Sequence, residues 1–229
     1  MNQRPHLDQY RSGVGVHDKS GNSNYYSMQR PEIAKLLPRP VNRILDVGCG
    51  EGVFAKFLKD QGLAQEVWGV ELNEGLSLVA AQHLDKVLIG DISAIISDLP
   101  AEFFDVVFFN DSLEHMVDPF SVLNSIRAKI SRNGYVIGSL PNIGYIRQVY
   151  ELIIQKDWRY CDQGIMDRTH LRFFTLKSMK RMFSETNFTA ETVVGIAPIR
   201  RVLFVLFKYL SFGWLTDSLY RQYIWRLRL

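Results

Sequence analysis

The sequence predicts an α/β fold in which a doubly wound, mostly parallel sheet carries helices on both faces. Two observations predict it. Short apolar runs suited to buried strands alternate five times with segments whose apolar residues recur at helical spacing. The first three runs also contain or end in an acid, Asp46, Glu71 and Asp91, which suits ligand binding at the carboxyl ends of parallel strands.

Length and composition favour one large domain and limit its partners. The chain has 229 residues, 47% of them hydrophobic, which is enough for one substantial core. Its net charge is only +3, and basic residues gather in 196–229, where six Lys or Arg face the single acid Asp217. This balance disfavours a general nucleic-acid-binding surface, so we expect no nucleic-acid partner. The two cysteines, Cys49 and Cys161, make no disulfide framework and no signal peptide opens the chain, so we expect a cytoplasmic protein.

The first forty residues are expected to form a lead-in and a lid. Residues 1–40 are polar and broken by glycine until a short helical stretch at 30–37, which two prolines end. Tyr26 and Arg30 are placed to close over a cofactor bound by the main domain, residues 41–229, and Arg30 can pair with a carboxylate of that cofactor. The alternative is that these side chains pack the helix onto the sheet.

A buried strand that stops in a glycine-rich turn marks the predicted cofactor site. Residues 44–52 read I-L-D-V-G-C-G-E-G, and such glycines permit positive φ and a close approach of the backbone to a ligand. The dinucleotide pattern G-x-G-x-x-G needs a glycine where this chain has Val53, which counts against a nicotinamide dehydrogenase. An acid inside the strand disfavours a phosphate and favours a cationic ligand. The cofactor-binding candidates here are Asp46, Gly48, Cys49 and Gly50.

Two further strands end in acids that suit a nucleoside. Residues 66–71 end in Glu71, which in a βαβ unit lies beside the first turn and can accept hydrogen bonds from both ribose hydroxyls. A helix over 74–84 leads to a third strand at 87–91, where Asp91 suits the exocyclic amine of adenine and Ile92 one face of its ring. The other expected cofactor contacts are Leu72 and Asn110.

The fourth strand leads into a cluster of titratable residues. Residues 103–110 are almost continuously apolar, which is typical of a central strand. They run into D-S-L-E-H-M-V-D-P at 111–119, which next to the first strand would be the switch point where a doubly wound sheet opens to ligands. Pro119 begins a helix that contains Ile130, and Asn133-Gly134 turns the chain into a fifth strand at 135–140.

The remaining chain is expected to add an insertion, two helices and two strands. Residues 141–174 mix aromatics with charges and should line the substrate side of the cleft, the alternative being an ordinary surface excursion. A helix at 177–186 and a strand at 189–196 follow. The apolar stretch within 200–229 is too short to span a bilayer, which needs about 20 residues. With its flanking arginines it is either an interfacial membrane or partner contact, or a cover for the sheet before an edge strand at 220–229.

Residues 25 to about 195 resemble the class I methyltransferases that use S-adenosylmethionine, in particular bacterial glycan-associated and ubiquinone-pathway-type O-methyltransferases. The resemblance rests on Y-Y-S-M-Q-R-P, L-D-V-G-C-G-E-G, L-E-H-M-V-D-P, S-L-P-N and D-R-T-H-L-R-F-F-T. It implies a Rossmann-like sheet of seven strands, S-adenosylmethionine as cofactor, and methyl transfer to a hydroxyl of a sugar or other small molecule, as in cell-surface polysaccharide biosynthesis. The alternatives are a quinone or phenol O-methyltransferase, and a non-catalytic module that keeps the cofactor pocket and docks a partner or a membrane.

Methyl transfer to a hydroxyl needs a group that removes the proton. Glu114, His115 and His170 are the catalytic candidates, because a histidine with an ordinary pKa of about 6.5 can accept that proton. The resemblance adds a divalent cation as an alternative, since some relatives hold one at these positions, here Asp111, Glu114, His115 and His170. Asp111 stands where a glutamate is usual. The simpler interpretation is that Glu114 and His115 only order the loop before the next helix.

Overall fold

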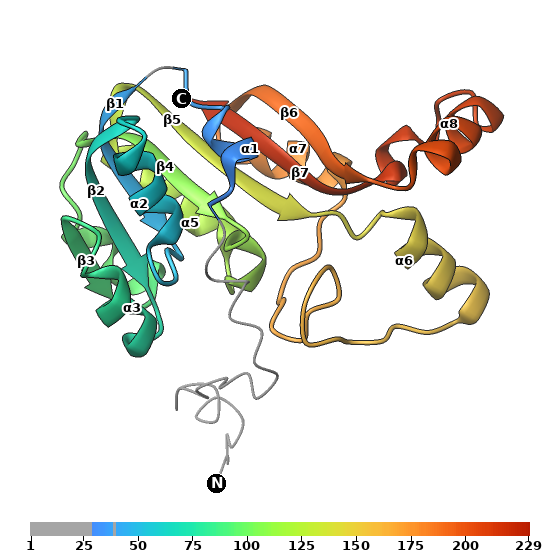
Figure 1. Ribbon diagram of the computed structural model, residues 1–229, viewed down its shortest axis with the longest axis horizontal. Coiled ribbons are helices and arrows are strands. Elements are labelled where there is room, and N and C mark those ends of the chain that lie inside the picture. The colour runs from blue at the N-terminus through green and yellow to red at the C-terminus, as the bar shows by residue number, and fades with distance from the viewer. Residues whose placement is uncertain (1–28, 39) are drawn as a thin grey trace, which may run out of the picture.

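A seven-stranded mixed sheet carries helices on both faces in the computed structural model, which describes residues 29–38 and 40–229 (Figure 1). Its helices and strands are α1 (Pro31–Ala34), β1 (Val41–Val47), α2 (Val53–Asp60), β2 (Ala64–Glu71), α3 (Glu74–Ala80), β3 (Lys86–Ile89), α4 (Ile92–Ile95), β4 (Phe104–Asn110), α5 (Pro119–Ile126), β5 (Ile130–Pro141), α6 (Ile146–Tyr150), α7 (Leu176–Glu185), β6 (Thr189–Pro198), α8 (Arg201–Leu210) and β7 (Tyr220–Arg228).

The strand order is β3-β2-β1-β4-β5-β7-β6. The first five strands in this order pair in parallel, and β7 is antiparallel to both of its neighbours. The order reverses between β1 and β4, which are direct neighbours. The predicted α/β class, the doubly wound arrangement and the position of the switch point are therefore confirmed.

Two apolar layers, one on each face of the sheet, explain why the central strands are nearly continuous apolar runs. Along β4, Val106 and Phe108 belong to the layer formed with α1, α2 and α3, whereas Val107 and Phe109 belong to the layer formed with α4, α5 and α7. All four side chains are fully buried. Burial of each side chain contributes roughly 1.5–3 kcal/mol to folding. Because β4 packs in both layers, its position in the sheet is fixed, and so is the position of the polar residues that follow it.

The last strand differs from the prediction. An edge strand at 220–229 is wrong, because β7 lies between β5 and β6, and β6 forms the edge. Trp225 packs in one apolar layer and Ile224 in the other, so β7 is covered on both faces. Arg226 pairs with Glu191 of β6 at 3.1 Å and holds the neighbouring strand. A strand with bulky apolar residues on both faces is stable only inside a sheet.

Smaller differences concern element boundaries. The helix predicted over 74–84 ends at Ala80. Ile130 begins β5 instead of continuing the helix after Pro119. Asn133 and Gly134 lie within β5, next to a register shift against β4, so the predicted turn is an irregularity of the strand.

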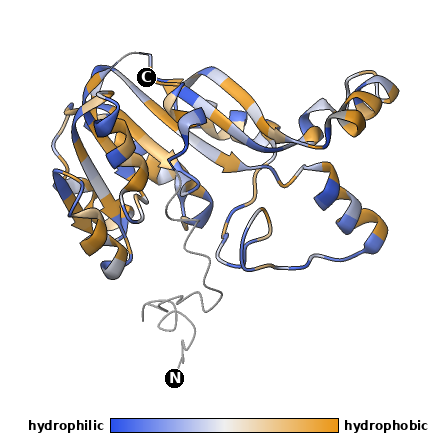
Figure 2. Ribbon diagram, viewed as in Figure 1, coloured by the Kyte–Doolittle hydropathy of each residue, from blue (hydrophilic) through white to orange (hydrophobic). Residues whose placement is uncertain are grey.

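Two helical segments project from the molecule at the end away from β3 (Figure 1). One is α6, which continues as a π-helical turn over Glu151–Gln155, and the other is α8. Hydrophobic residues are prominent on α8 and also occur on the first segment (Figure 2). In the described part of the chain, no helix combines the length and the apolar character that crossing a bilayer would require.

Candidate active site

The turn after β1 has the predicted backbone conformation. Gly48, Gly50 and Gly52 adopt φ values of 79°, 55° and 77°, which side chains other than glycine rarely accept. A Cβ atom on Gly48 would lie only 2.9 Å from Cβ of Ser112, so this glycine also lets the turn approach the end of β4. The Gly48 amide donates to the Val70 carbonyl at 2.8 Å, which ties the turn to β2.

Glu71 lies beside this turn, as predicted. One of its carboxylate oxygens accepts from the Gly50 amide at 2.8 Å, and the other accepts from the Asn73 amide at 2.9 Å. A carboxylate offers about four lone-pair positions, so two hydrogen bonds leave room for two hydroxyl donors. The next residue, Leu72, exposes 72% of its surface, which leaves an apolar side chain free to cover a ring.

Asp46 is a buried acid with an incomplete set of partners. Only 3% of its surface is exposed, and among the described residues its Oδ1 atom has no hydrogen-bond partner. Burial, and secondarily the charge of Glu71, raises the pKa of Asp46 to about 7. A cationic or hydrogen-bond-donating ligand would favour the ionised form, so the residue fits a cofactor that carries an ammonium group.

Three further cofactor candidates make contacts within the protein itself. Asp91 is the N-cap of α4, and its Oδ1 accepts from the amide and the hydroxyl of Ser93 at 2.8 and 2.7 Å. Ile92 packs in the core, so its side chain is largely covered already. Cys49 is also buried, and burial raises the pKa of its thiol, with Asp46 and Glu71 adding to the effect. The thiol is therefore protonated and serves packing.

The end of β4 carries more polar atoms without partners. Both side-chain polar atoms of Asn110 and the hydroxyl of Ser112 are buried and make no hydrogen bond with the described residues. Buried polar groups are normally paired, so a set of unpaired ones at adjacent strand ends fits a ligand that supplies the partners. Ser112 is not among the predicted site residues. A small polar residue shortly after a central strand is nevertheless a usable sign of a ligand contact.

Arg30 holds protein carboxylates in this structure. Its Nη1 atom lies 2.6 Å from Asp111 Oδ2, and its Nε atom lies 2.7 Å from Glu32 Oε1. A role of Arg30 toward a cofactor carboxylate stays a prediction, and it would require one of these pairs to open. Tyr26 lies outside the described residues.

A role of Asp111 as a metal ligand stays a prediction, and other groups of the chain hold its carboxylate in this structure. Besides Arg30, its carboxylate accepts from the Ser139 hydroxyl at 2.8 Å and from the Gln222 side chain. These donors engage both oxygens, and Asp111 does not belong to the group of potential ligand atoms that lie near one another. It ties the end of β4 to α1, β5 and β7.

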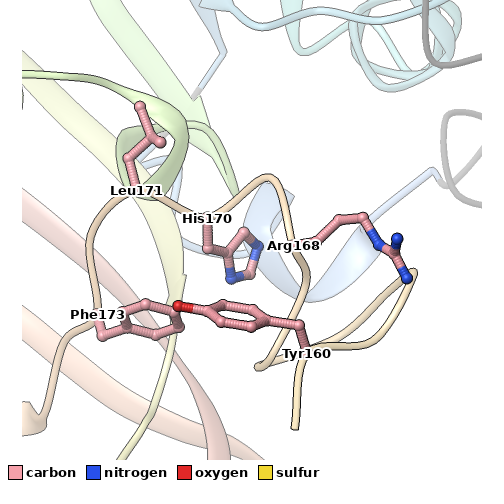
Figure 3. Close-up of a pocket in the computed structure, with 5 residues that line it drawn as sticks. All are labelled: Tyr160, Arg168, His170, Leu171 and Phe173. Atoms are coloured by element: carbon pink, nitrogen blue, oxygen red, sulfur yellow. The ribbon is translucent and has the colours of Figure 1, made fainter. Parts of the chain in front are cut away.

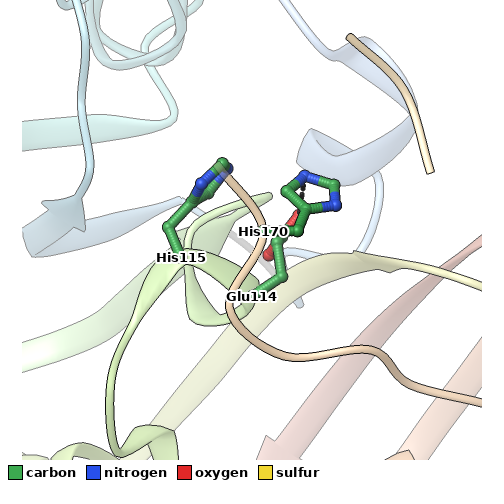
Figure 4. Close-up of side chains that lie close together, drawn as sticks. All are labelled: Glu114, His115 and His170. Carbon is green, nitrogen blue, oxygen red and sulfur yellow. Dashed lines mark ion pairs between the residues drawn. The ribbon is translucent and has the colours of Figure 1, made fainter. Parts of the chain in front are cut away.

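Glu114, His115 and His170 do come together (Figure 4). The Nε2 atom of His170 lies 4.0 Å from Glu114 Oε1, and the two imidazole centroids are 4.7 Å apart. His170 Nδ1 lies 3.0 Å from the Ile165 carbonyl, to which it can only donate, so Nε2 of the neutral ring carries the lone pair. His115 Nδ1 lies 3.2 Å from the Thr169 carbonyl.

Hydrogen bonds from the backbone of the insertion connect it to this cluster. The amides of Leu171 and Arg172 both donate to the Glu114 carbonyl, at 2.8 and 3.0 Å. The Arg172 guanidinium donates to the Val117 carbonyl at 3.1 Å. These bonds join the loop after β4 to the insertion and set His170 against Glu114.

Burial sets the protonation of the cluster. Glu114 is fully buried, and burial followed by the charge of Asp111 raises its pKa well above the ordinary value. Burial and the neighbouring His170 lower the pKa of His115. His115 is therefore neutral at pH 7 and can accept a proton.

The same three side chains are chemically suited to a divalent cation. Their potential ligand atoms lie within 4.8 Å of one another, and both oxygens of the buried Glu114 are unpaired among the described residues. His170 donates its other ring N–H to a backbone carbonyl, as metal-bound histidines usually do. Imidazole and carboxylate ligands are compatible with several divalent cations, among them Zn²⁺, Mn²⁺ and Mg²⁺.

A cavity of about 580 Å³ opens next to His170 (Figure 3). It is lined by Tyr160, Arg168, His170, Leu171 and Phe173. Trp158 packs edge-on against Phe173 with ring centroids 5.4 Å apart, which braces the aromatic wall. All of these residues belong to the insertion, whose role on the substrate side stays a prediction.

Known methyltransferases resemble this chain in sequence. A family model described as a methyltransferase domain matches residues 23–193. A ubiquinone biosynthesis O-methyltransferase of Vibrio campbellii is 29% identical over 160 residues, 67% of this chain and 66% of that protein. Its counterpart in Coxiella burnetii is 29% identical over 116 residues, 48% of each chain. The chain therefore spans slightly less than two thirds of the length of the first of these relatives.

The fold has solved counterparts. A SAM-dependent methyltransferase from Archaeoglobus fulgidus superposes with a TM-score of 0.67 at 17% identity, over 91% of this chain and 97% of that one. The sheet order, the glycine-rich turn and the strand-end acids define the class I S-adenosylmethionine-dependent methyltransferases. The chain belongs to the methyltransferase-domain family of this class.

Proposed function

We propose that this chain transfers the methyl group of S-adenosylmethionine to a hydroxyl of a small-molecule acceptor. The observation that carries the proposal is the group of buried, unpaired polar atoms of Asp46, Asn110, Ser112 and Glu114 at the carboxyl ends of β1 and β4. They lie at the switch point, where the sheet opens to ligands. His170 joins this group to the aromatic cavity.

The cofactor-binding residues would hold S-adenosylmethionine and orient its methyl group toward the acceptor. Glu71 offers its remaining lone pairs to ribose hydroxyls, Leu72 offers an apolar surface to the adenine, and Asp46 is available to an ammonium group. Bound S-adenosylmethionine supplies an electrophilic methyl group on a sulfonium. Holding donor and acceptor in line removes much of the entropic part of the barrier.

The histidines manage the acceptor's proton. As the acceptor oxygen bonds to the methyl carbon, its proton has to leave, and Nε2 of His170 or a free ring nitrogen of His115 can receive it. The hydrogen bonds of the opposite ring nitrogens to backbone carbonyls keep both rings oriented. A protonated His170 would favour the ionised form of Glu114, whose pKa burial otherwise raises, and the two opposite charges would then stabilise each other across 4.0 Å.

A divalent cation is the alternative way to activate the hydroxyl. Glu114, His115 and His170 would hold it, and it would lower the pKa of a bound hydroxyl as a Lewis acid. Activation by a histidine base and activation by a cation use the same residues. Only an experiment that removes the metal can distinguish them.

The acceptor has two candidate classes. The motifs that resemble glycan-associated methyltransferases support a sugar hydroxyl, as in cell-surface polysaccharide biosynthesis. The similarity to ubiquinone biosynthesis O-methyltransferases and the aromatic wall of Tyr160, Phe173 and Trp158 support a phenol or quinone-type ring, because flat aromatic acceptors stack on such side chains.

The proposal is tested in two stages. Calorimetric titration with S-adenosylhomocysteine and, separately, with NAD establishes the cofactor, and binding of NAD alone would refute the proposal. Transfer of a labelled methyl group is then measured with a catechol-type phenol and with a free or nucleotide-linked sugar. Cofactor binding without transfer to any acceptor would support the non-catalytic module instead.

A further inference from the structure

The segment from α8 to residue 215 presents its apolar side chains to solvent. Phe212 exposes 99% and Trp214 85% of its surface. Other large apolar residues of the segment are also exposed, namely Val202, Leu203, Val205, Leu206, Tyr209 and Leu210. Contiguous apolar surface of this kind marks an interaction site, because isolated exposed apolar residues are common but clusters are not.

The helix has an amphipathic pattern that faces outward. Val202, Leu206 and Tyr209 follow the i, i+4, i+7 spacing and form one stripe, and Lys208 lies on the opposite side. In a helix that packs on its own domain such a stripe is buried, whereas these three side chains are exposed.

The turn after α8 displays an aromatic residue at its tip. Phe212 adopts a φ of 50° and Gly213 a φ of 84°. The amides of Phe212 and Gly213 donate to the carbonyls of Tyr209 and Lys208, at 3.1 and 2.9 Å, so the turn is closed and defined. Positive φ is strained for a bulky residue, and glycine is the usual choice at this position.

The charges around the segment have one sign. Residues 192–216 contain no Asp or Glu and hold Arg200, Arg201 and Lys208. An anionic surface is complementary to this segment. A second copy of the chain would bring the same cations together, which disfavours self-association through this face.

We propose that residues 200–215 dock the protein onto a membrane surface that contains anionic lipids. The apolar stripe, Phe212 and Trp214 enter the boundary between headgroups and acyl chains, and Arg200 and Lys208 reach the lipid phosphates beside them. The helix has 10 residues and is about 15 Å long, so it lies along the surface. Aromatic residues that accompany cations without acids are typical of membrane interfaces. This inference is independent of the proposed methyl transfer.

The test is sedimentation of the purified protein with phosphatidylcholine vesicles prepared with and without phosphatidylglycerol. We expect binding to the anionic vesicles that weakens as salt rises. Phe212→Ser with Trp214→Ser should reduce binding by about tenfold or more, because two large apolar side chains no longer leave water. Leu78→Ser is the matched control, since it changes an exposed apolar side chain on α3, and it should bind like the parent.

A conservative second variant, Trp214→Phe, tests the same surface without the risk that the protein fails to fold. Trp214→Phe should keep vesicle binding and lose most of the blue shift in tryptophan emission that binding produces. Failure of the parent to bind anionic vesicles would overturn the proposal, as would equal loss in the Leu78→Ser control. Concentration-dependent dimers that disappear in the Phe212→Ser, Trp214→Ser variant, without vesicle binding, would assign the surface to a second copy.

Discussion

The proposed cofactor side and the proposed acceptor side of the site are built differently. On the proposed cofactor side, the ends of β1 and β2 hold the buried acid Asp46 and the backbone-bonded acid Glu71. On the acceptor side, a long insertion places half-exposed rings such as Tyr160 around an open cavity. Affinity for a constant cofactor can depend on a few fixed groups, whereas acceptor choice can change with a loop while the sheet stays the same.

The largest expected effect is a loss of turnover when the two histidines between the proposed cofactor and acceptor sides are replaced. His115→Ala combined with His170→Ala should lower turnover by about 10²–10⁴-fold, the usual contribution of a general base, and leave S-adenosylhomocysteine affinity unchanged. Turnover and calorimetry on one preparation check this. His83→Ala, a histidine outside the site, serves as control. Parental turnover in the double variant would exclude both histidines as catalytic groups.

Metal removal tests whether a cation acts together with these histidines. If a cation activates the acceptor, turnover should fall after exhaustive chelation and return when manganese or zinc is added, and His170→Ala should abolish that recovery. Turnover that is unchanged by chelation would eliminate the cation and leave the histidines to act as bases.

Glu71→Ala tests the cofactor side alone. Loss of hydrogen bonds to a charged group should weaken S-adenosylhomocysteine binding by about 1–3 kcal/mol, or roughly 5- to 150-fold. Calorimetric titration measures the change, with Glu74→Ala, at the first residue of α3, as the control. An unchanged dissociation constant would remove Glu71 from the ribose site.

The buried Asp46 predicts a pH dependence. Its pKa of about 7 means that the free protein binds a proton there, so S-adenosylhomocysteine affinity should rise about tenfold between pH 6 and pH 8 as the carboxylate forms. Because the folded pKa lies above that of the unfolded chain, the ligand-free protein should also lose stability as pH rises from about 4 to 7. Titrations and urea unfolding at each pH test both effects. Asp46→Asn should flatten both profiles, and a persistent slope would point to another group.

The smallest effect is expected on the acceptor side. Trp158→Ala with Arg159→Ala should raise the acceptor KM severalfold and leave cofactor affinity unchanged, because Trp158 braces Phe173 in the cavity wall. Steady-state kinetics with the best acceptor measures the change, with the exposed Leu152→Ala as control. A parallel fall in cofactor affinity would place the insertion over the cofactor and erase the distinction between the two sides.

The sequence predicted the conformation of the glycine-rich turn and the position of Glu71 well because their determinants are local. Asp46 and the glycines that follow it lie within one turn, and the positive φ values are a direct consequence of residue type. Glu71 could be placed because a βαβ unit fixes how one strand end lies beside the next. His170 could be associated with Glu114 only through the family resemblance, since no local rule relates positions so far apart.

Long-range partners could not be predicted. The D-x-x-E-H spacing suggested that Asp111 and Glu114 share a ligand, and it could not show that Asp111 pairs with Arg30, 81 positions away, and accepts from Gln222, 111 positions away. Strand order is a similar case, because pairing partners of β7 are remote in sequence. The apolar residues on both of its faces, Ile224 and Trp225, were nevertheless a readable sign of an interior strand.

The interior position of β7 has a consequence for synthesis on the ribosome. β5 and β6 are neighbours of β7 and not of each other, yet both emerge before it. Until Tyr220–Arg228 appears, the β5 edge stays open, and Gly138, over which the Trp225 ring packs, has no cover. At about 5–20 residues per second, translation from the end of β5 to the start of β7 takes roughly 4–16 s. During that interval the nascent chain presents an unpaired strand edge, and shielding by a chaperone would matter most then.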